Sequence, residues 1–103
     1  MNIHVETGVE KFLKSLDKET AAKTAKTIDL LEKFGNELRM PHSKKVAAKI
    51  FELRVVGKSE VRILYTFHAG VAFLLHGFVK KTPKLLSKNL SAAIRKRKDI
   101  VER

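Results

Sequence analysis

The fold of this chain is decided by residues 51–79, which read FELRVVGKSEVRILYTFHAGVAFLLHGFV. Apolar residues recur at every second position along most of this stretch, and a period of two is that of β-strands with one buried face. Turn residues interrupt the alternation at Gly57-Lys58 and at Ala69-Gly70. The pattern therefore predicts an antiparallel meander of three strands joined by two hairpins.

The register of the three strands follows from their two faces, because a slip of one residue would turn every apolar side chain to the wrong side. Pairing Val55 with Val61 aligns the first hairpin, and pairing Phe67 with Val71 aligns the second. All apolar residues of the strands are then expected on one face, packed against helices. The other face is expected to carry a row of three side chains across the strands: Arg54, Arg62 and His76.

The residues before the meander predict a helical hairpin. Thr7-Gly8-Val9-Glu10 has the pattern of a capping box, which predicts a first helix over about 8–16. Asp17 suits the N-cap of a second helix, and Gly35 suits its end. A final helix is expected over about 87–102. The second helix is expected to bury an apolar stripe that consists of Ala21, Ala25, Ile28, Leu31 and Phe34.

These elements predict an α+β fold, in which a helical hairpin packs on an antiparallel meander and a C-terminal helix follows. A short strand at Ile3 and Val5 is expected before the hairpin. The length of 103 residues suits a single domain over 1–103. No apolar run is long enough to span a membrane, no signal peptide is apparent, and no cysteine is present. We therefore expect a cytoplasmic protein.

The net charge of +11 is distributed unevenly along the chain. Residues 1–34 contain six Lys or Arg and six acids, which sum to zero. Residues 35–68 contain seven and three, giving +4, and residues 69–103 contain nine and two, giving +7. A balanced first third and a basic remainder predict a surface that faces a polyanion such as nucleic acid. The alternative is a generally soluble basic protein without such a surface.

The pairing of Arg54 with Arg62 needs an explanation, because like charges directly opposite each other destabilise a sheet. A bound phosphate would remove the repulsion, and its oxygens match the fork geometry of arginine. An ordinary surface network in which Glu52 bridges the two arginines would remove it as well. Further lysines are expected to flank the same cleft, from the end of the third strand and from the loop that enters the sheet: Lys44, Lys45, Lys80, Lys81 and Lys84.

The sequence contains no recognisable metal or nucleotide motif, so we expect no metal and no cofactor. RNA can be cut without either, by its own 2′-OH, if cations stabilise the growing charge and a side chain accepts the proton. Histidine is suited to proton exchange near neutral pH, which makes His76 a candidate, with Glu52 as another. The alternative for His76 is a half-buried residue bonded to a neighbour.

The run Arg95-Lys96-Arg97-Lys98 in the final predicted helix has two interpretations. Cations near a helix C-terminus complement the helix dipole, which explains a solvated basic face adequately. In the second interpretation, Arg95 and Arg97 contact RNA or a protein partner. The sequence favours neither interpretation over the other.

Several segments, taken in order, resemble the RelE/HigB superfamily of type II toxins, and in particular its phage-derived branch. The resemblance covers about residues 8–103. The spacing of the segments makes it fairly specific. The segments are Lys44-Lys45, Phe51-Glu52-Leu53-Arg54, Val61-Arg62-Ile63-Leu64-Tyr65 and Leu74-Leu75-His76-Gly77-Phe78-Val79-Lys80-Lys81-Thr82.

The resemblance implies a RelE/ParE-like fold and a toxin that cuts mRNA on the ribosome. It also implies a cognate antitoxin, typically a helix-turn-helix protein, and metal-free attack of the ribose 2′-OH on the adjacent phosphate. Arg62 matches the strand arginine that binds the scissile phosphate, and Lys81 falls where RelE has a second catalytic arginine. The catalytic residues implied are Arg62, Lys81, His76 and Arg54. The general base and general acid stay open, because the final helix lacks the tyrosine that some relatives carry there.

Two other functions stay open. A ParE-like toxin, which poisons gyrase, shares the fold but not the chemistry. A non-catalytic RNA-binding module would need only the basic surface, since its affinity for RNA would come from phosphate contacts. The residues expected to bind RNA are Lys44, Lys45, Lys80, Lys84, Arg95 and Arg97.

Overall fold

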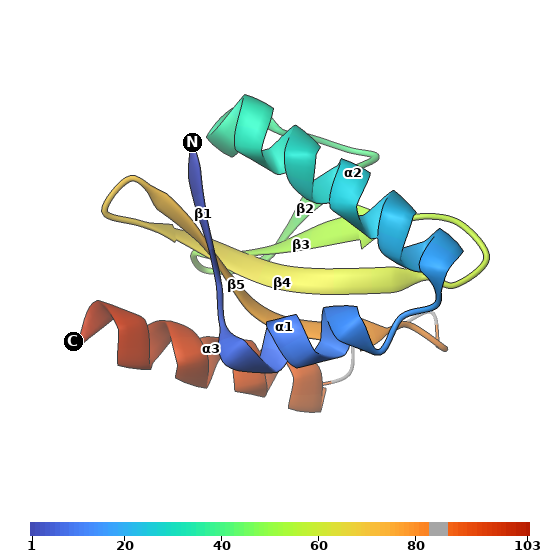
Figure 1. The fold of residues 1–103 in the computed structure, drawn as a ribbon. Coiled ribbons are helices and arrows are strands. Elements are labelled where there is room, and N and C mark those ends of the chain that lie inside the picture. Colours follow the sequence, from blue (N-terminus) through green and yellow to red (C-terminus); the bar gives the residue numbers. More distant parts are fainter. Residues whose placement is uncertain (83–86) are drawn as a thin grey trace.

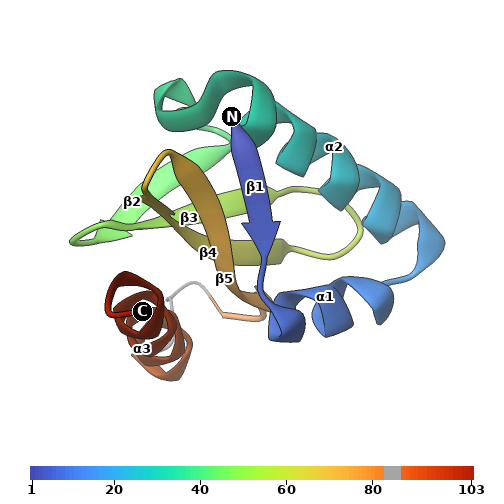
Figure 2. The same cartoon turned by 60° about the vertical axis from the view of Figure 1, so that its left-hand side comes forward.

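The computed structural model describes residues 1–82 and 87–103. Its elements are, in chain order, β1 (Asn2–Val5), α1 (Thr7–Lys14), α2 (Lys18–Phe34), the 3-10 turn η1 (Gly35–Glu37), β2 (Ser43–Ala47), β3 (Ile50–Val55), β4 (Val61–His68), β5 (Val71–Val79) and α3 (Ser87–Val101). The strands form one mixed sheet in the order β1-β5-β4-β3-β2 (Figure 1). In Figure 2, α1 and α2 lie over one face of this sheet and α3 lies over the other. The fold is therefore α+β, as expected.

The predicted meander is confirmed as β3, β4 and β5, and the predicted opening strand is confirmed as β1, which pairs parallel to β5. One strand was not expected. Lys44 and Lys45 lie on β2, which pairs with β3 at the edge of the sheet, rather than in a loop. β2 lacks the apolar alternation of the inner strands because an edge strand is exposed and tolerates charged residues. Lysines at such an edge also discourage pairing with other chains.

The register between β3 and β4 is the predicted one, and Arg54 lies opposite Arg62. The predicted register between β4 and β5 is wrong. Arg62 lies opposite Phe78, and His76 lies opposite Leu64. The expected row of two arginines and a histidine therefore contains the two arginines but not His76.

Two features of the second hairpin explain the difference. Its loop consists of Ala69 and Gly70, which have positive φ angles of 51° and 76°, so that Val71 pairs with His68. Two positive φ angles give a two-residue loop a twist that matches the flanking strands. A β-bulge then leaves Leu75 without a partner in the ladder and shifts the rest of β5 by one more residue.

The expectation that all apolar residues of the strands share one face is also wrong. Helices α1 and α2 cover one core, which contains Leu53 and Leu74 of the sheet. On the opposite face, Leu64 belongs to a second core together with Ala93 and Ile100 of α3. Residues 61–66 of β4 are therefore buried on both faces of the sheet, which explains why Leu64 is apolar although it lies out of phase with Ile63 and Tyr65.

The ends of α2 follow the sequence, with Asp17 as its N-cap and Gly35, at a φ of 56°, as its C-cap. The predicted capping box at the start of α1 is wrong. The N-cap of α1 is Glu6, and Thr7 is already the first residue of the helix. The backbone N–H of Glu10 donates to the carbonyl oxygen of Glu6 at 3.0 Å, which closes the first turn one residue earlier than expected.

The buried face of α2 differs from the predicted apolar stripe. Leu31 is buried as expected, but Ala25 and Phe34 are exposed. Thr24 and Thr27 take their places, and their hydroxyls donate to backbone carbonyls four residues earlier, at 2.8 and 3.0 Å. These hydrogen bonds satisfy the hydroxyls inside the helix, so the threonine methyl groups can pack in the buried layer.

Gly77 allows α1 to approach β5 closely. A Cβ atom at this position would lie 2.9 Å from Cε2 of Phe12 and still closer to Cδ2. We predict that Gly77→Ala displaces α1 and lowers the free energy of unfolding by about 1–3 kcal/mol, measured by urea denaturation. Gly8→Ala is the control, because nothing lies within 4 Å of a Cβ there. Equal stability of the two variants would contradict this packing.

Tyr65 is 1% exposed, and its hydroxyl lies 2.5 Å from Oγ of Ser43. Burial raises the pKa of Tyr65 above its ordinary value, against the opposing effect of the Ser43 hydrogen bond. Since the folded-state pKa exceeds the unfolded one, this group's contribution is intact at neutral pH and is lost as the pH rises above about 10. We predict that thermal stability falls more steeply there in the wild type than in Tyr65→Phe. Parallel curves would show that the tyrosine does not titrate on unfolding.

Candidate nucleic-acid interface

Arg62 lies at the start of β4 and is 2% exposed, although it carries a full charge. Its Nη2 donates to Oε1 of Glu60 at 3.0 Å. Its Nη1 donates to the carbonyl oxygens of Val61 at 3.0 Å and of Val55 at 3.4 Å. A buried guanidinium needs such acceptors because its desolvation is costly. The hairpin between β3 and β4 therefore fixes the position of Arg62.

Glu52 lies between the two paired arginines, and its side chain is 4% exposed. Its Oε1 lies 3.8 Å from Nε of Arg62 and 3.9 Å from Nε of Arg54. The carboxylate thus bridges the two arginines. This is the arrangement expected from the explanation in which Glu52, rather than a bound phosphate, relieves their repulsion. Both distances are too long for hydrogen bonds. Within residues 1–82 and 87–103, neither Nε atom has a hydrogen-bond acceptor, although both are buried.

A hollow of about 390 Å³ opens beside these arginines. We call it the cationic hollow; it is lined by Arg54, Glu60, Arg62, Lys80, Lys81 and Thr82. Lys80 is held at its edge, because its backbone N–H donates to the carbonyl oxygen of Glu60 at 2.8 Å. Four cations and one carboxylate surround the space, so its field favours an anion. The expected grouping of Arg54, Arg62, Lys80 and Lys81 is therefore present.

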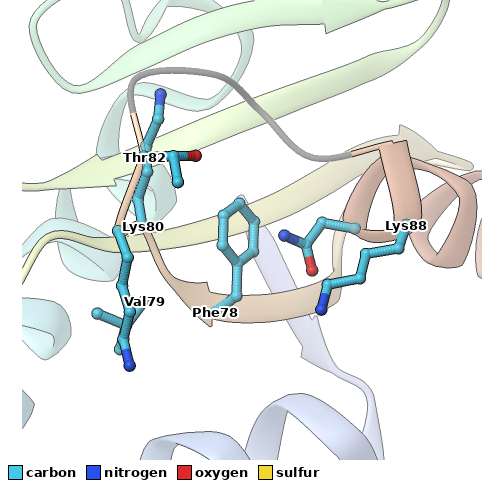
Figure 3. Close-up of a pocket in the computed structure, with 7 residues that line it drawn as sticks. Phe78, Val79, Lys80, Thr82 and Lys88 are labelled. Atoms are coloured by element: carbon cyan, nitrogen blue, oxygen red, sulfur yellow. The ribbon is translucent and has the colours of Figure 1, made fainter.

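A second hollow of about 220 Å³ adjoins the first. Lys80, Lys81 and Thr82 line both hollows. In Figure 3, the ring of Phe78 lies between the chain that carries Lys80 and Thr82 and the first turn of α3, which carries Lys88. The two hollows therefore adjoin through the three residues that they share, and Phe78 is the aromatic residue among their described lining residues.

His76 is half-buried and lies outside both hollows. Its Nε2 lies 2.8 Å from Oδ1 of Asn89, and its ring lies against that of Phe78, with centroids 5.8 Å apart. Asn89 is buried and lines the smaller hollow. His76 therefore reaches the candidate site through Asn89, an arrangement that matches the alternative interpretation of this residue.

Lys44 and Lys45 point to opposite faces of the sheet, because successive side chains of a strand alternate. Lys44 lies opposite Glu52 in the register and so shares the face of the paired arginines. Lys45 lies opposite Phe51 and lines a separate hollow with Phe51 and Phe67. The structure therefore brings Lys44, but not Lys45, to the face that carries the cationic hollow.

Arg95 and Arg97 do not line the cationic hollow. Arg95 is exposed on α3 and lines a separate hollow of about 350 Å³ with Lys96 and Asp99. Arg97 is partly buried, and its Nε has no hydrogen-bond partner in the described part of the chain. Lys84 lies outside the described residues.

Sequence reasoning missed Glu60, Lys88 and Asn89. Glu60 precedes Arg62 by two residues, and this spacing of two was a usable signal that both side chains reach the same face of a strand. Lys88 and Asn89 had no such signal. Their position depends on how α3 docks on the sheet, which no local pattern specifies.

Residues 1–82 and 87–103 contain no group of three or more His, Asp or Glu that could hold a metal ion. No helix in these ranges is long and apolar enough to cross a membrane.

Comparison with known proteins identifies the family of this chain. No curated protein matches this chain. Residues 11–98 match the family described as phage derived protein Gp49-like (DUF891), a toxin-like family related to toxin–antitoxin systems. The match spans the meander and the cationic hollow, and it does not single out RelE or HigB themselves. This chain belongs to the phage-derived Gp49-like family (DUF891).

Proposed function

We propose that this protein is the toxin of a type II toxin–antitoxin pair and that it cuts mRNA on the ribosome, in the cytoplasm. The observation that supports this most directly is the cationic hollow, where Arg54, Arg62 and Lys81 from three segments surround a space of about 390 Å³. Membership of a toxin–antitoxin-related family supports an antitoxin as partner. The proposed antitoxin is a helix-turn-helix protein encoded beside the toxin.

The proposed reaction is a transesterification within the RNA. The 2′ oxygen forms a bond to the adjacent phosphorus while the bond from phosphorus to the 5′ oxygen breaks. One product ends in a 2′,3′-cyclic phosphate and the other begins with a 5′-hydroxyl. The proton of the 2′-OH passes to a base, and a second proton passes to the departing oxygen. The cations of the hollow would stabilise the negative charge that grows on the non-bridging phosphate oxygens.

The accessibility of the cations suggests which of them contact the phosphate and which act from below through their charge. Arg54, with a side chain 26% exposed, and the exposed Lys81 are the proposed ligands of the scissile phosphate. Arg62 lies beneath them and is proposed to act through its charge and its unsatisfied Nε. Neighbouring phosphates are proposed to contact Lys44, Lys80 and Lys88. Contacts to more distant RNA are proposed for Lys45, Lys84, Arg95 and Arg97.

Two side chains compete for the role of proton acceptor. Glu60 lines the cationic hollow and has a side chain 45% exposed, which favours it over His76 on access. We predict that Glu60→Gln lowers the single-turnover cleavage rate by about 10²-fold or more, the usual contribution of a general base, and that His76→Ala lowers it less. The reverse order would assign the base to His76. Unfolding curves of both variants check that neither loss reflects instability.

Inducing the gene in a bacterial host tests the proposed function. We expect growth to stop and transcripts to be cut within their reading frames, which mapping of RNA 5′ ends would detect. Normal growth at good soluble expression would contradict the proposal. A DNA-damage response without RNA cleavage would indicate a gyrase-poisoning toxin of the ParE type. Salt-dependent RNA binding without cleavage would indicate a non-catalytic module.

A further inference from the structure

Arg54 also lines a second cavity, on the side facing α2. This cavity of about 430 Å³ lies between α2 and the end of β3, and we call it the α2 groove. Cations line part of it: Lys23 and Lys26 from α2, and Arg54 from β3. Its aliphatic walls include Leu30, Val55 and Val56.

The exposure of aliphatic side chains around the α2 groove is unusual for a surface in contact with water alone. Val56 is 66% exposed, and Met40 next to Arg54 is 56% exposed. The Sδ atom of Met40 lies 3.4 Å from Nη1 of Arg54, so the apolar residues and the cation are in contact. An exposed apolar patch with a charged rim marks a surface that binds a partner.

The chemistry of the α2 groove favours a polypeptide over RNA. Its described lining residues include no Phe, Tyr or Trp, and the imidazole of His42 is the one aromatic ring among them, so a nucleobase would find little stacking surface there. None carries a carboxylate either, so the charge on the rim is of one sign. Aliphatic walls with a cationic rim are complementary to a segment that has apolar side chains on one face and carboxylates beside them.

We propose that the α2 groove binds an acidic amphipathic segment of the antitoxin. Apolar side chains of that segment pack on Leu30 and Val56, and its carboxylates pair with Lys23, Lys26 and Arg54. A partner of this kind neutralises part of the excess positive charge and removes the exposed aliphatic residues from water.

The position of Arg54 gives this contact a regulatory consequence, which rests on the proposed function. Arg54 lines both the α2 groove and the cationic hollow. A carboxylate that binds the Arg54 guanidinium from the groove withdraws it from the RNA phosphate in the hollow. Antitoxin and RNA therefore compete for one side chain, and each lowers the affinity of the protein for the other by the same factor.

Isothermal titration calorimetry on the full-length protein tests the groove, with the purified product of the neighbouring gene, the proposed antitoxin, as the probe. Val56→Glu places a carboxylate in the groove, and we expect it to raise Kd by about tenfold or more, as for an interface anchor. Ile94→Glu is the matched control, because Ile94 is also a large exposed aliphatic residue, at 48%, but lies on α3. Equal losses in the two variants, or no binding by the wild type, would overturn the proposal.

Two further measurements separate a lost contact from a folding defect and separate antitoxin binding from nucleic-acid binding. Lys26→Glu changes only an exposed side chain, so its expected loss of antitoxin affinity is independent of any folding defect in Val56→Glu. A labelled 2′-deoxy oligonucleotide, which cannot be cut by 2′-OH attack, reports the competition by fluorescence anisotropy. We expect antitoxin to weaken oligonucleotide binding to the wild type. If Val56→Glu weakens oligonucleotide binding and leaves antitoxin binding intact, the groove is a nucleic-acid site and the proposal fails.

The outcomes for the groove and for the proposed function are separable. Calorimetry and anisotropy need no cleavage. A protein that binds antitoxin at the groove but cuts no RNA would therefore support the groove proposal and contradict the proposed nuclease activity. If the protein cuts RNA, and the wild type and Val56→Glu bind antitoxin equally well, the nuclease activity is supported and the groove proposal is contradicted.

Discussion

Replacement of Lys81 by alanine is expected to lower the rate of RNA cleavage by roughly 10²–10³-fold, the usual cost of removing one donor that stabilises transition-state charge. Lys81 lines both hollows and is exposed, so its ammonium group can reach a phosphate without rearrangement of the core. The rate is measured by single-turnover cleavage of a defined mRNA. Arg54→Ala is expected to have a similar effect.

The controls for this prediction separate local chemistry from total charge. Lys96→Ala removes one charge from an exposed position of α3 outside the two hollows and should leave the rate nearly unchanged. Lys81→Arg keeps the charge and should retain a large part of the activity. Equal rates in Lys81→Ala and Lys96→Ala would show that the cationic hollow is not where phosphate is held.

Glu52→Gln is expected to have the largest effect on stability. Glu52 is 3% exposed and lies between Arg54 and Arg62, so its neutralisation leaves two neighbouring guanidinium groups without the carboxylate that bridges them. Removing one partner from a buried ion pair costs about 3–5 kcal/mol, and we expect a loss near 3 kcal/mol, because Glu60 still binds Arg62. Urea denaturation measures it.

An added anion provides a specific check on this explanation. Sulfate should stabilise Glu52→Gln more than the wild type, because an anion in the cationic hollow replaces part of the missing charge. Glu10→Gln is the control, since Glu10 is exposed and pairs only weakly with Lys14 at 3.7 Å. A loss of less than about 1 kcal/mol in Glu52→Gln would mean that the arginine pair does not depend on the bridge.

The register of the first hairpin was predictable, because β3 and β4 alternate regularly and no bulge interrupts their pairing. That register placed Arg54 opposite Arg62 from the sequence alone. The second register was not predictable to the same degree. The two-residue loop at Ala69-Gly70 and the bulge at Leu75 together move His76 out of the row. Both features depend on backbone geometry that the alternation of apolar residues does not encode.

The coverage of both sheet faces explains the other errors. Leu64 and Leu74 interrupted the expected alternation because they face different cores, under α3 and under the helical hairpin respectively. The threonines of α2 were not recognised as buried, because their hydroxyls are satisfied within the helix. In each case, tertiary packing decided which of two locally acceptable faces was buried.

The candidate site was predictable in its cations and not in its carboxylates. The charge map and the strand parity pointed to Arg54, Arg62, Lys80 and Lys81, which line one hollow in the structure. Glu52 entered only as an alternative, yet it lies between the arginines. Glu60 was not considered, although it binds Arg62 and faces the hollow. A count of net charge identifies the cations that are in excess, but it does not identify the carboxylates that pair with them.

The proposed reaction requires that the ribose 2′ oxygen attacks the adjacent phosphate. Replacement of the single 2′-OH at a mapped cleavage site by 2′-O-methyl tests it most directly, in a translated mRNA that is otherwise unmodified. We predict that cleavage at that site disappears, while the unmodified mRNA yields a 2′,3′-cyclic phosphate and a 5′-hydroxyl. Continued cleavage at the methylated nucleotide, or products that carry a 5′-phosphate, would contradict it.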